Sequence, residues 1–559
     1  MDKYLQKFSI ERDEGYMDSK SKVEFVDKYL GALLGAMVGD ALGWVYEDRG
    51  MNTGKYVNIQ RNFVSWSRRA GGRYQPHEEY ISAGSYSDDT QLIFASARSL
   101  QYKNWFSHFV KIELPSWLLY ERGGGGATKR AAETWSNGHP PWKLEKQNVD
   151  SIKRYFNAGG NGVTMRIMPH VFFCKNRLEE LTNQVFLNGI ATHGHPRALL
   201  SAIVFSWAMH YLVQKENNLE YGELVSYLLD NKDNWGQFPK VNNIKDWKEA
   251  SNFAATVKYD DLWVATANEL VSGLELISKA MKKGLRDSKM ETLEKLNCFD
   301  KSTRGAGTVA TLVAIYMASK YAADPASAVM DLASMQNADT DTIASMTGSL
   351  LGAIHGTEWI YPEWYLVQDY DYARKLVHNV GQIIFEDTNE TLWNSSDNRN
   401  IKESIPNLKR ADSISIGPFS SVTLQEVSKN KTSSKNFNIS TYQFKSDEGQ
   451  TIYIKIIKKI SERPDVKQIQ GSIEPQQKNS IINKEPIKVI LSDIDIEKLS
   501  GILPPRVTAI KLFALISDFL QEKGNIQKLI TKHESKTLNV DNIKQVLALL
   551  ENNLIKSEK

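Results

Sequence analysis

Apolar residues repeat at helical spacing over the first two-thirds of the chain. From about residue 27 to residue 353 the segments are rich in Ala, Leu and Gly, and few alternating strand patterns interrupt them. Gly-rich or Asn-rich loops separate the segments. The pattern predicts an all-α domain with helices at 26–42, 90–100, 195–213, 262–281, 307–321 and 342–354.

The composition changes after this helical region. Residues 388–435 are rich in Asn, Ser, Lys and Asp, which is typical of a linker or of mobile loops. This change indicates a domain boundary near residue 400, and beyond it we expect short strands at 420–427, 440–444, 451–460 and 488–494, and helices at 507–520 and 543–555. The sequence therefore predicts an N-terminal extension (1–26), a helical domain (27–390), and a linker followed by a small α+β domain of unknown function (391–559).

Size and charge exclude few classes of protein. The chain of 559 residues exceeds what one hydrophobic core usually fills, so two domains or more are expected. Its net charge of +3 gives no strong electrostatic argument for nucleic acid, although a local basic patch stays open. Cys174 and Cys298 are too few for a disulfide framework, which favours a reducing compartment. Without a secretory signal or a run of about 18 apolar residues, we expect a cytoplasmic protein that spans no membrane.

Two short acidic motifs each precede an apolar helical stretch. They are SDDT at 87–90 and DTDT at 339–342. At the start of a helix, such side chains can cap free backbone N–H groups, and for one isolated motif this structural role would be favoured. A cap needs one oxygen, however, whereas each motif offers two acids and two hydroxyls within four residues. The surplus of oxygen atoms points to another partner.

Hard divalent cations are the partners that such oxygen atoms suit. Mg²⁺ takes octahedral oxygen coordination and retains several waters. Neither motif contains His or Cys, which disfavours zinc. If the two motifs meet in space, they could hold two such ions, but their separation along the chain leaves that meeting open.

Five segments in a fixed order resemble the ADP-ribosylglycohydrolases, specifically the dinitrogenase-reductase-activating type of ADP-ribosylhydrolase. The resemblance covers roughly residues 27–360. The segments that carry it are GALLGAMVGDALGWVYE (31–47), GSYSDDT (84–90), GNGVTMRIMP (160–169), ATHGHPRAL (191–199) and NADTDTIASMTGSLLGAIHG (337–356).

The resemblance implies an all-helical catalytic domain whose central cleft holds two Mg²⁺ ions, with Mn²⁺ able to substitute. It also implies hydrolysis of the bond between C1″ of ADP-ribose and its acceptor. Ser87 stands where many relatives have Thr, which keeps an oxygen ligand. The residues that match the metal ligands of the family are Ser87, Asp88, Asp89, Asp339, Asp341 and Thr342.

Two carboxylates are candidates for the general base. The ions would bind the distal ribose hydroxyls and orient a water for attack at C1″, and either Asp89 or Glu47 would accept its proton. Glu47 matches the mobile acidic residue of the family; outside this motif it would be expected to face solvent. For Asp40, in the same GDALG run, we expect a structural hydrogen bond to a neighbouring helix or loop.

Loops and histidines of the resembling segments form the expected ADP-ribose cleft. The loop at 160–163 could direct backbone N–H groups at a pyrophosphate, although a GNG tripeptide alone is more often a turn. Arg166 would hold this loop by pairing with a carboxylate, and Tyr155 and Phe156 are more readily core residues than adenine stackers. The substrate-binding residues expected from the resemblance are Gly125, Gly160, Asn161, Gly162, Val163, His193 and His195.

Two other functions compete with hydrolysis. A non-catalytic ADP-ribose-binding protein would lack metal ligands, whereas this chain has all six. Alternatively, the C-terminal domain could recruit a partner protein or nucleic acid through YIKIIKKI (453–460), for which a solvated hairpin face is the simpler interpretation.

We expect residues 1 to about 400 to fold by themselves and to act on small substrates without the rest of the chain. The acceptor of ADP-ribose stays open among arginine, serine, nucleic acid and small conjugates.

Overall fold

A computed structural model gives the conformation of most of the first 460 residues. It describes residues 19–460, apart from 48–60, 73–74, 147, 175–176, 217, 243, 255–256, 381–383, 386–391 and 433–435, and also residues 515, 541 and 543–545. The chain divides into two compact units, Met1–Glu462 and Arg463–Lys559. The expected strand at 488–494 lies outside the described residues, as do the expected helices at 507–520 and 543–555 apart from residues 515 and 543–545. The small α+β domain therefore stays a prediction.

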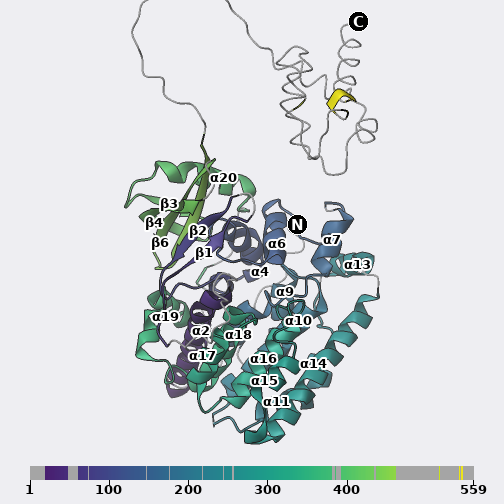
Figure 1. Ribbon diagram of the computed structural model, residues 1–559. Helices are drawn as coiled ribbons and strands as arrows, with labels where there is room; N and C mark the ends of the chain where they lie inside the picture. Colours follow the sequence, from purple (N-terminus) through teal and green to yellow (C-terminus); the bar gives the residue numbers. More distant parts are fainter. Residues whose placement is uncertain are drawn as a thin grey trace, which may run out of the picture. The chain divides into compact units, whose positions relative to one another are not determined.

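Helices form most of the first unit (Figure 1). All six predicted helices are confirmed, as α2, α3, α10, α14, α16 and α18. α2 begins at Ser19 and so includes part of the expected N-terminal extension. The α-helices are α2 (Ser19–Glu47), α3 (Asp88–Ser99), α4 (Trp105–His108), α5 (Leu114–Trp117), α6 (Gly126–Ser136), α7 (Val149–Phe156), α8 (Met168–Cys174), α9 (Leu178–Ile190), α10 (Pro196–Gln214), α11 (Glu223–Asp230), α12 (Lys232–Trp235), α13 (Lys245–Ala254), α14 (Tyr259–Lys282), α15 (Lys289–Lys295), α16 (Gly307–Lys320), α17 (Pro325–Ala333), α18 (Thr340–His355), α19 (Tyr370–His378) and α20 (Ser395–Ser404). Shorter helical turns are η1 (Phe109–Glu113), η2 (Thr164–Arg166), η3 (Gly284–Arg286), η4 (Pro362–Leu366) and η5 (Ile405–Asn407).

Helices α2 and α18 pack with their backbones in contact. Glycines recur every four residues along α2, at Gly31, Gly35, Gly39 and Gly43, and so lie in one row of the helix surface. A Cβ atom at Gly39 would lie 2.3 Å from the Ala344 carbonyl oxygen of α18, so any larger residue would push the helices apart. By length and composition α2 could cross a membrane, but 89% of its apolar window is buried within the protein. This helix is the core of the helical unit, and the residue that ends it, Glu47, comes beside the start of α18.

The structure corrects the expectation of a purely helical domain. Two antiparallel sheets accompany the helices, with strand orders β1-β2-β5 and β3-β4-β6-β7. The first sheet was missed because adjacent charged residues, Arg68-Arg69 in one strand and Glu78-Glu79 in the next, interrupt any apolar alternation, and Arg68 pairs with Glu79 across the strands. The strands are β1 (Trp66–Ala70), β2 (His77–Ile81), β3 (Ser413–Ile416), β4 (Phe419–Lys429), β5 (Lys431–Thr432), β6 (Phe437–Ser446) and β7 (Thr451–Lys459).

The expected strands at 420–427, 440–444 and 451–460 are confirmed as β4, β6 and β7. They do not follow a linker, because α20 and β3 occupy most of the described residues between 392 and the start of β4. In register, Tyr442 of β6 faces Ile454 of β7, and the inward side chains of this sheet belong to the same apolar core as the helices. The compact unit thus extends to Glu462, beyond the boundary expected at residue 391. That residues 1 to about 400, or residues 1–462, fold by themselves is a prediction.

Candidate active site

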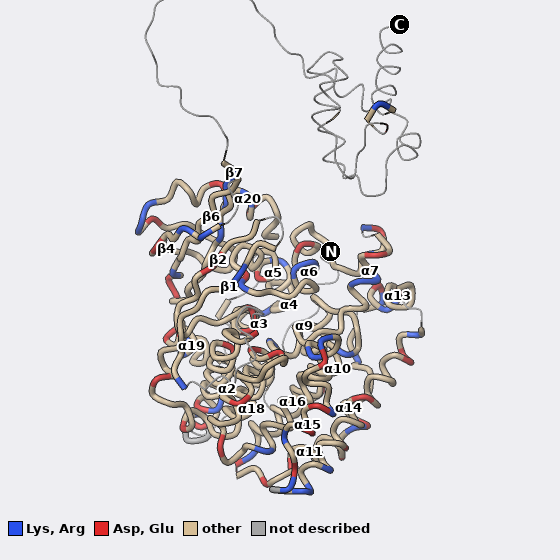
Figure 2. The backbone as a smooth tube through the Cα atoms, in the orientation of Figure 1, with Lys and Arg blue, Asp and Glu red and all other residues tan. Residues whose placement is uncertain are grey.

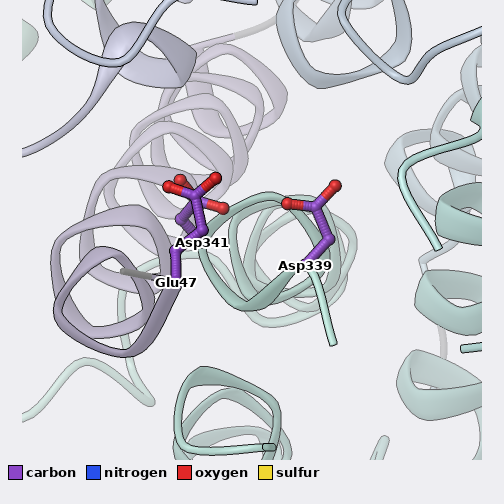
Figure 3. A group of neighbouring side chains, drawn as sticks. All are labelled: Glu47, Asp339 and Asp341. Carbon is purple, nitrogen blue, oxygen red and sulfur yellow. The ribbon is translucent and has the colours of Figure 1, made fainter. Parts of the chain in front are cut away.

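Close packing of α2 against α18 brings distant acidic residues together. Glu47 is the last residue of α2, Asp339 precedes α18, and Asp341 lies in its first turn. Each offers a carboxylate oxygen, and these three atoms lie within 4.8 Å of one another. Figure 3 shows the three side chains at the neighbouring ends of the two helices. Within the described residues this group could therefore share a cation.

The second acidic motif begins α3, and Asp40 of α2 holds it in place. Asp40 accepts hydrogen bonds from the backbone N–H of Ser87 (2.9 Å) and of Thr90 (3.0 Å), and from the Thr90 hydroxyl (2.6 Å). The structural role expected for Asp40 is confirmed. Ser87 caps α3 through the N–H of Asp89 (3.2 Å), so its hydroxyl oxygen already has one partner.

The two motifs, about 250 positions apart, meet. The Thr342 side chain partly offsets the raised pKa of Asp89, and the charge of Asp89 raises the pKa of Asp341. Burial first, and then neighbouring carboxylates, raise the pKa of Asp88, Asp89 and Asp341 well above the usual value. Such a cluster of buried like charges is unfavourable unless protons or cations neutralise it.

The donor atoms fit a hard divalent cation. Oδ2 of Asp89 is buried and has no hydrogen-bond donor among the described residues, so it is left with an unused lone pair. Carboxylate and hydroxyl oxygens are the ligands that Mg²⁺ prefers. Cation binding would displace the protons that the raised pKa values imply, so affinity should increase with pH. That the six predicted ligands hold two ions remains a prediction.

Glu47 differs from Asp89 in its access to water. Glu47 is exposed, whereas Asp89 is 3% exposed. The surrounding protein still withdraws much of the hydration of Glu47, and this desolvation, followed by the charge of Asp339, raises its pKa to about 7. Glu47 can therefore reach a solvent-borne ligand or a water, while Asp89 can only face the interior of the cluster.

The glycine loop at 160–163 lies beside the acidic cluster. The Asn161 side chain donates to Oδ2 of Asp339 (2.7 Å). The Asn161 backbone N–H donates to Gly305 (3.0 Å), which occupies one of the N–H groups expected to face a pyrophosphate. Val163 is fully buried, so it could contribute only its backbone. The loop also pairs through Gly160 with Ala306, from a Gly-containing segment that sequence reasoning overlooked.

Arg166 anchors this loop differently from the expectation. Its guanidinium donates to the carbonyl of Gly162 (2.8 Å), to the side chain and carbonyl of Asn188 (2.8 and 2.9 Å), and to the Thr192 hydroxyl (2.8 Å). No carboxylate is among these partners, so the expected ion pair is wrong but the holding role is confirmed. The acceptors come from Gly162 of the loop, from Asn188 near the end of α9 and from Thr192, a combination that a residue pattern does not reveal.

The two histidines occupy different positions. His193 is buried beneath the loop, and a Cβ atom at Gly162 would lie 3.1 Å from its ring. Burial, followed by the charges of Arg166 and Arg130, lowers the pKa of His193 to about 3, so its ring is neutral. The His195 side chain caps α10 by accepting from the Arg197 N–H (3.0 Å). Only His193 lies directly under the loop.

The aromatic pair before the loop belongs to the core. The Tyr155 hydroxyl donates to the carbonyl of Ile190 (2.6 Å) and accepts from Trp247 (2.9 Å). Phe156 is 5% exposed and packs against Trp247 and Tyr259. The preference for a structural role over adenine stacking is confirmed for both residues.

The four-glycine loop before α6 touches the cluster at an unexpected position. A Cβ atom at Gly123 would lie 3.1 Å from Oδ1 of Asp88, so a side chain there would crowd this carboxylate. Gly125 precedes α6 and has open space around it. Glu121, which sequence reasoning missed, accepts from the Gly124 N–H (2.9 Å), and its charge contributes to the raised pKa of Asp88.

A buried ion cluster links this loop to the second sheet. Glu79 of β2 pairs with Arg68 (2.9 Å), with Arg122 (3.3 Å) and with Lys455 of β7 (2.9 Å). Burial raises the pKa of Glu79, but the charges of the three cations outweigh it and hold the pKa below its usual value. Arg122 immediately precedes Gly123, so the strand β7 supports the loop that contacts Asp88.

Comparisons with known proteins identify the helical part of the chain. A family model described as ADP-ribosylglycohydrolase matches residues 21–390. The ADP-ribosylhydrolase ARH3 of Xenopus tropicalis is 23% identical over 359 residues, which cover 61% of this chain and 91% of that protein. An ADP-ribosyl-dinitrogen-reductase glycohydrolase of Rhodospirillum rubrum is 26% identical over 199 residues, which cover 34% of this chain and 58% of that protein. A solved ADP-ribosylglycohydrolase-related protein complex aligns with a TM-score of 0.40 at 18% identity, over 65% of this chain and 100% of that one.

Proposed function

This chain belongs to the ADP-ribosylglycohydrolase family and is a glycohydrolase, and we propose that it removes ADP-ribose from a modified acceptor in a Mg²⁺-dependent reaction that cleaves the bond at C1″. One observation carries the metal dependence. The acidic motifs at the starts of α3 and α18 converge, and Oδ2 of Asp89 is buried there without a donor. If the two motifs only capped their helices, this concentration of negative charge would have no function.

The chain's own residues suit separate tasks around such a centre. When bound, the ions would supply positive charge that orients ribose hydroxyls and lowers the pKa of a water. The six predicted oxygen ligands would hold them, and Asn161 would fix Asp339 through its hydrogen bond. We assign the general base to Glu47 because solvent reaches it, whereas Asp89 is enclosed.

The binding-only alternative is disfavoured by the same side chains. A protein that merely recognised ADP-ribose would not need Asp88, Asp89 and Asp341 buried together at the cost of mutual repulsion. In such a protein, burying Oδ2 of Asp89 without a hydrogen-bond donor would also have no function.

A panel of defined substrates tests the proposal. ADP-ribosyl-arginine, ADP-ribosyl-serine and an ADP-ribosylated oligonucleotide are incubated with the full-length protein and Mg²⁺, and free ADP-ribose is measured. We expect release from at least one acceptor class, which would identify the acceptor. If every substrate remains intact while the protein binds ADP-ribose, the non-catalytic alternative is correct.

A further inference from the structure

A second hollow lies next to the glycine loop, between α6 and α7. It is a cavity of about 350 Å³, a size that accommodates a small ligand. Ala127, Ala131 and Thr134 line it from α6, and Ser151 and Arg154 line it from α7. None of the acidic residues of the metal centre lines this cavity.

The cavity lies near the glycine loop, which contacts the carboxylates through Asn161. Ala158 and Thr192 line it, and Asn161, three residues after Ala158, donates to Asp339. Three Cα–Cα steps of 3.8 Å limit the distance between the Cα atoms of Ala158 and Asn161 to about 11 Å. A ligand with its distal ribose at the carboxylates can therefore extend its other end toward the cavity.

Positive charge sets the chemistry of this cavity. Arg130, Lys146 and Arg154 line it, and Glu133 is the one acidic side chain among its described lining residues. Nearby Lys143 pairs with Glu145 and with Asp246 (3.6 Å each). In contrast, Arg130, Lys146 and Arg154 form no ion pair in the described part of the chain. Figure 2 shows basic residues on both helices that flank the cavity.

Arg130 connects this charge with the start of α6 and with His193 beneath the glycine loop. A Cβ atom at Gly126 would lie 2.9 Å from its guanidinium, so the side chain folds back over the first residue of α6. The same charge lowers the pKa of His193, which lies beneath Gly162. Lys146 and Arg154 have no described interaction with α6 or with His193. They can therefore bind a part of the ligand that lies beyond the pyrophosphate.

We propose that Arg130, Lys146 and Arg154 bind a phosphate carried by the adenosine ribose of the substrate, an inference that rests on the proposed function. Arginine guanidinium groups match phosphate oxygens in charge and geometry, and exposed cations without an ion-pair partner gain from such a ligand. Two aromatic side chains line the described part of the cavity: Tyr155, which is 6% exposed and whose hydroxyl is bonded to Ile190, and the half-buried imidazole of His139. The three cations therefore outnumber the aromatic side chains that a base could stack on.

A phosphate can reach this position from two sources. It can be a 2′-phosphomonoester of the adenosine ribose, or the pyrophosphate of a second ADP-ribose unit joined to that ribose. Calorimetric affinities of the full-length protein for ADP-ribose, ADP-ribose 2′-phosphate and an ADP-ribose dimer, measured with Mg²⁺ at low salt, separate these sources. We expect one of the two phosphate-bearing ligands to bind roughly tenfold more tightly than ADP-ribose, and added salt to reduce the difference.

Matched variants locate the effect. In Lys146→Met with Arg154→Met, the preference for the phosphate-bearing ligand should fall to near onefold while affinity for ADP-ribose is retained. Lys153→Met removes one positive charge from α7, as Arg154→Met alone does, but at an exposed residue that does not line the cavity, and it should leave the preference unchanged. Equal affinities for all three ligands in the unaltered protein, or a preference that survives the double variant, would overturn the inference. Absence of any ADP-ribose binding would instead count against the proposed function.

Discussion

Asp341→Asn should lower turnover by on the order of a hundredfold or more while the protein stays folded. The substitution keeps size and one oxygen but removes the charge that a cation needs. Burial, Glu47 and Asp89 raise the pKa of Asp341 above its unfolded value, so its ionisation costs stability as pH rises. The metal-free variant should accordingly melt at the same temperature as the unaltered protein or higher.

Asp324→Asn provides the matched control. Asp324 caps α17 by accepting from the Ser327 N–H (3.4 Å), so it shows what the same change does at an ordinary helix cap. Asn caps about as well as Asp, and we expect turnover and melting temperature to change little. If Asp341→Asn behaves like this control, with near-normal turnover and metal affinity, then the acidic motifs are only caps.

Removal of the strands β3 to β7 should abolish activity, in contrast to what the sequence led us to expect of a fragment ending near residue 400. A chain ending at residue 410 keeps α2 to α20 but loses β7, whose Lys455 pairs with Glu79. It also loses Gln450, a partner of the buried Arg98, and Thr451, which bonds Asp369 (2.7 Å). We expect an insoluble or loosely folded product without turnover.

A chain ending at residue 462 is the control for this truncation. It contains the whole first compact unit, including every strand of the second sheet. It should be soluble and should release ADP-ribose from small substrates at a rate close to that of the full chain. Comparable turnover by the 410-residue fragment would show that the sheet neither supports the loop at Gly123 nor completes the core.

The helices and the acidic motifs could be predicted because their signals are local. Apolar spacing identified α2 and α18, and the excess of oxygen atoms in each motif indicated a cation before any geometry was known. Contacts between segments far apart in the chain could not be predicted from the sequence. The sequence shows the row of glycines in α2. It does not show that Gly39 contacts Ala344, because that contact depends on how the two helices pack.

The missed features share a physical reason. Glu79 looks like a solvated strand residue, and its burial becomes favourable only because Arg68, Arg122 and Lys455 converge on it from three parts of the chain. The same holds for the strand β3, whose surroundings are rich in polar residues and resemble a linker until the apolar core covers Ile416. Gly123 was overlooked in favour of Gly125 because four identical residues in a row carry no signal that separates them.

Metal removal from the full-length protein is the most direct test of metal-dependent ADP-ribose hydrolysis. The protein is stripped with a chelator, and ADP-ribose release and calorimetric metal binding are followed as Mg²⁺ or Mn²⁺ is returned. We predict no release in excess chelator, recovery with either ion, binding of two ions per chain, and loss of that binding in Asp341→Asn. Undiminished release by the stripped protein in excess EDTA would contradict the assignment of a metal-dependent hydrolase.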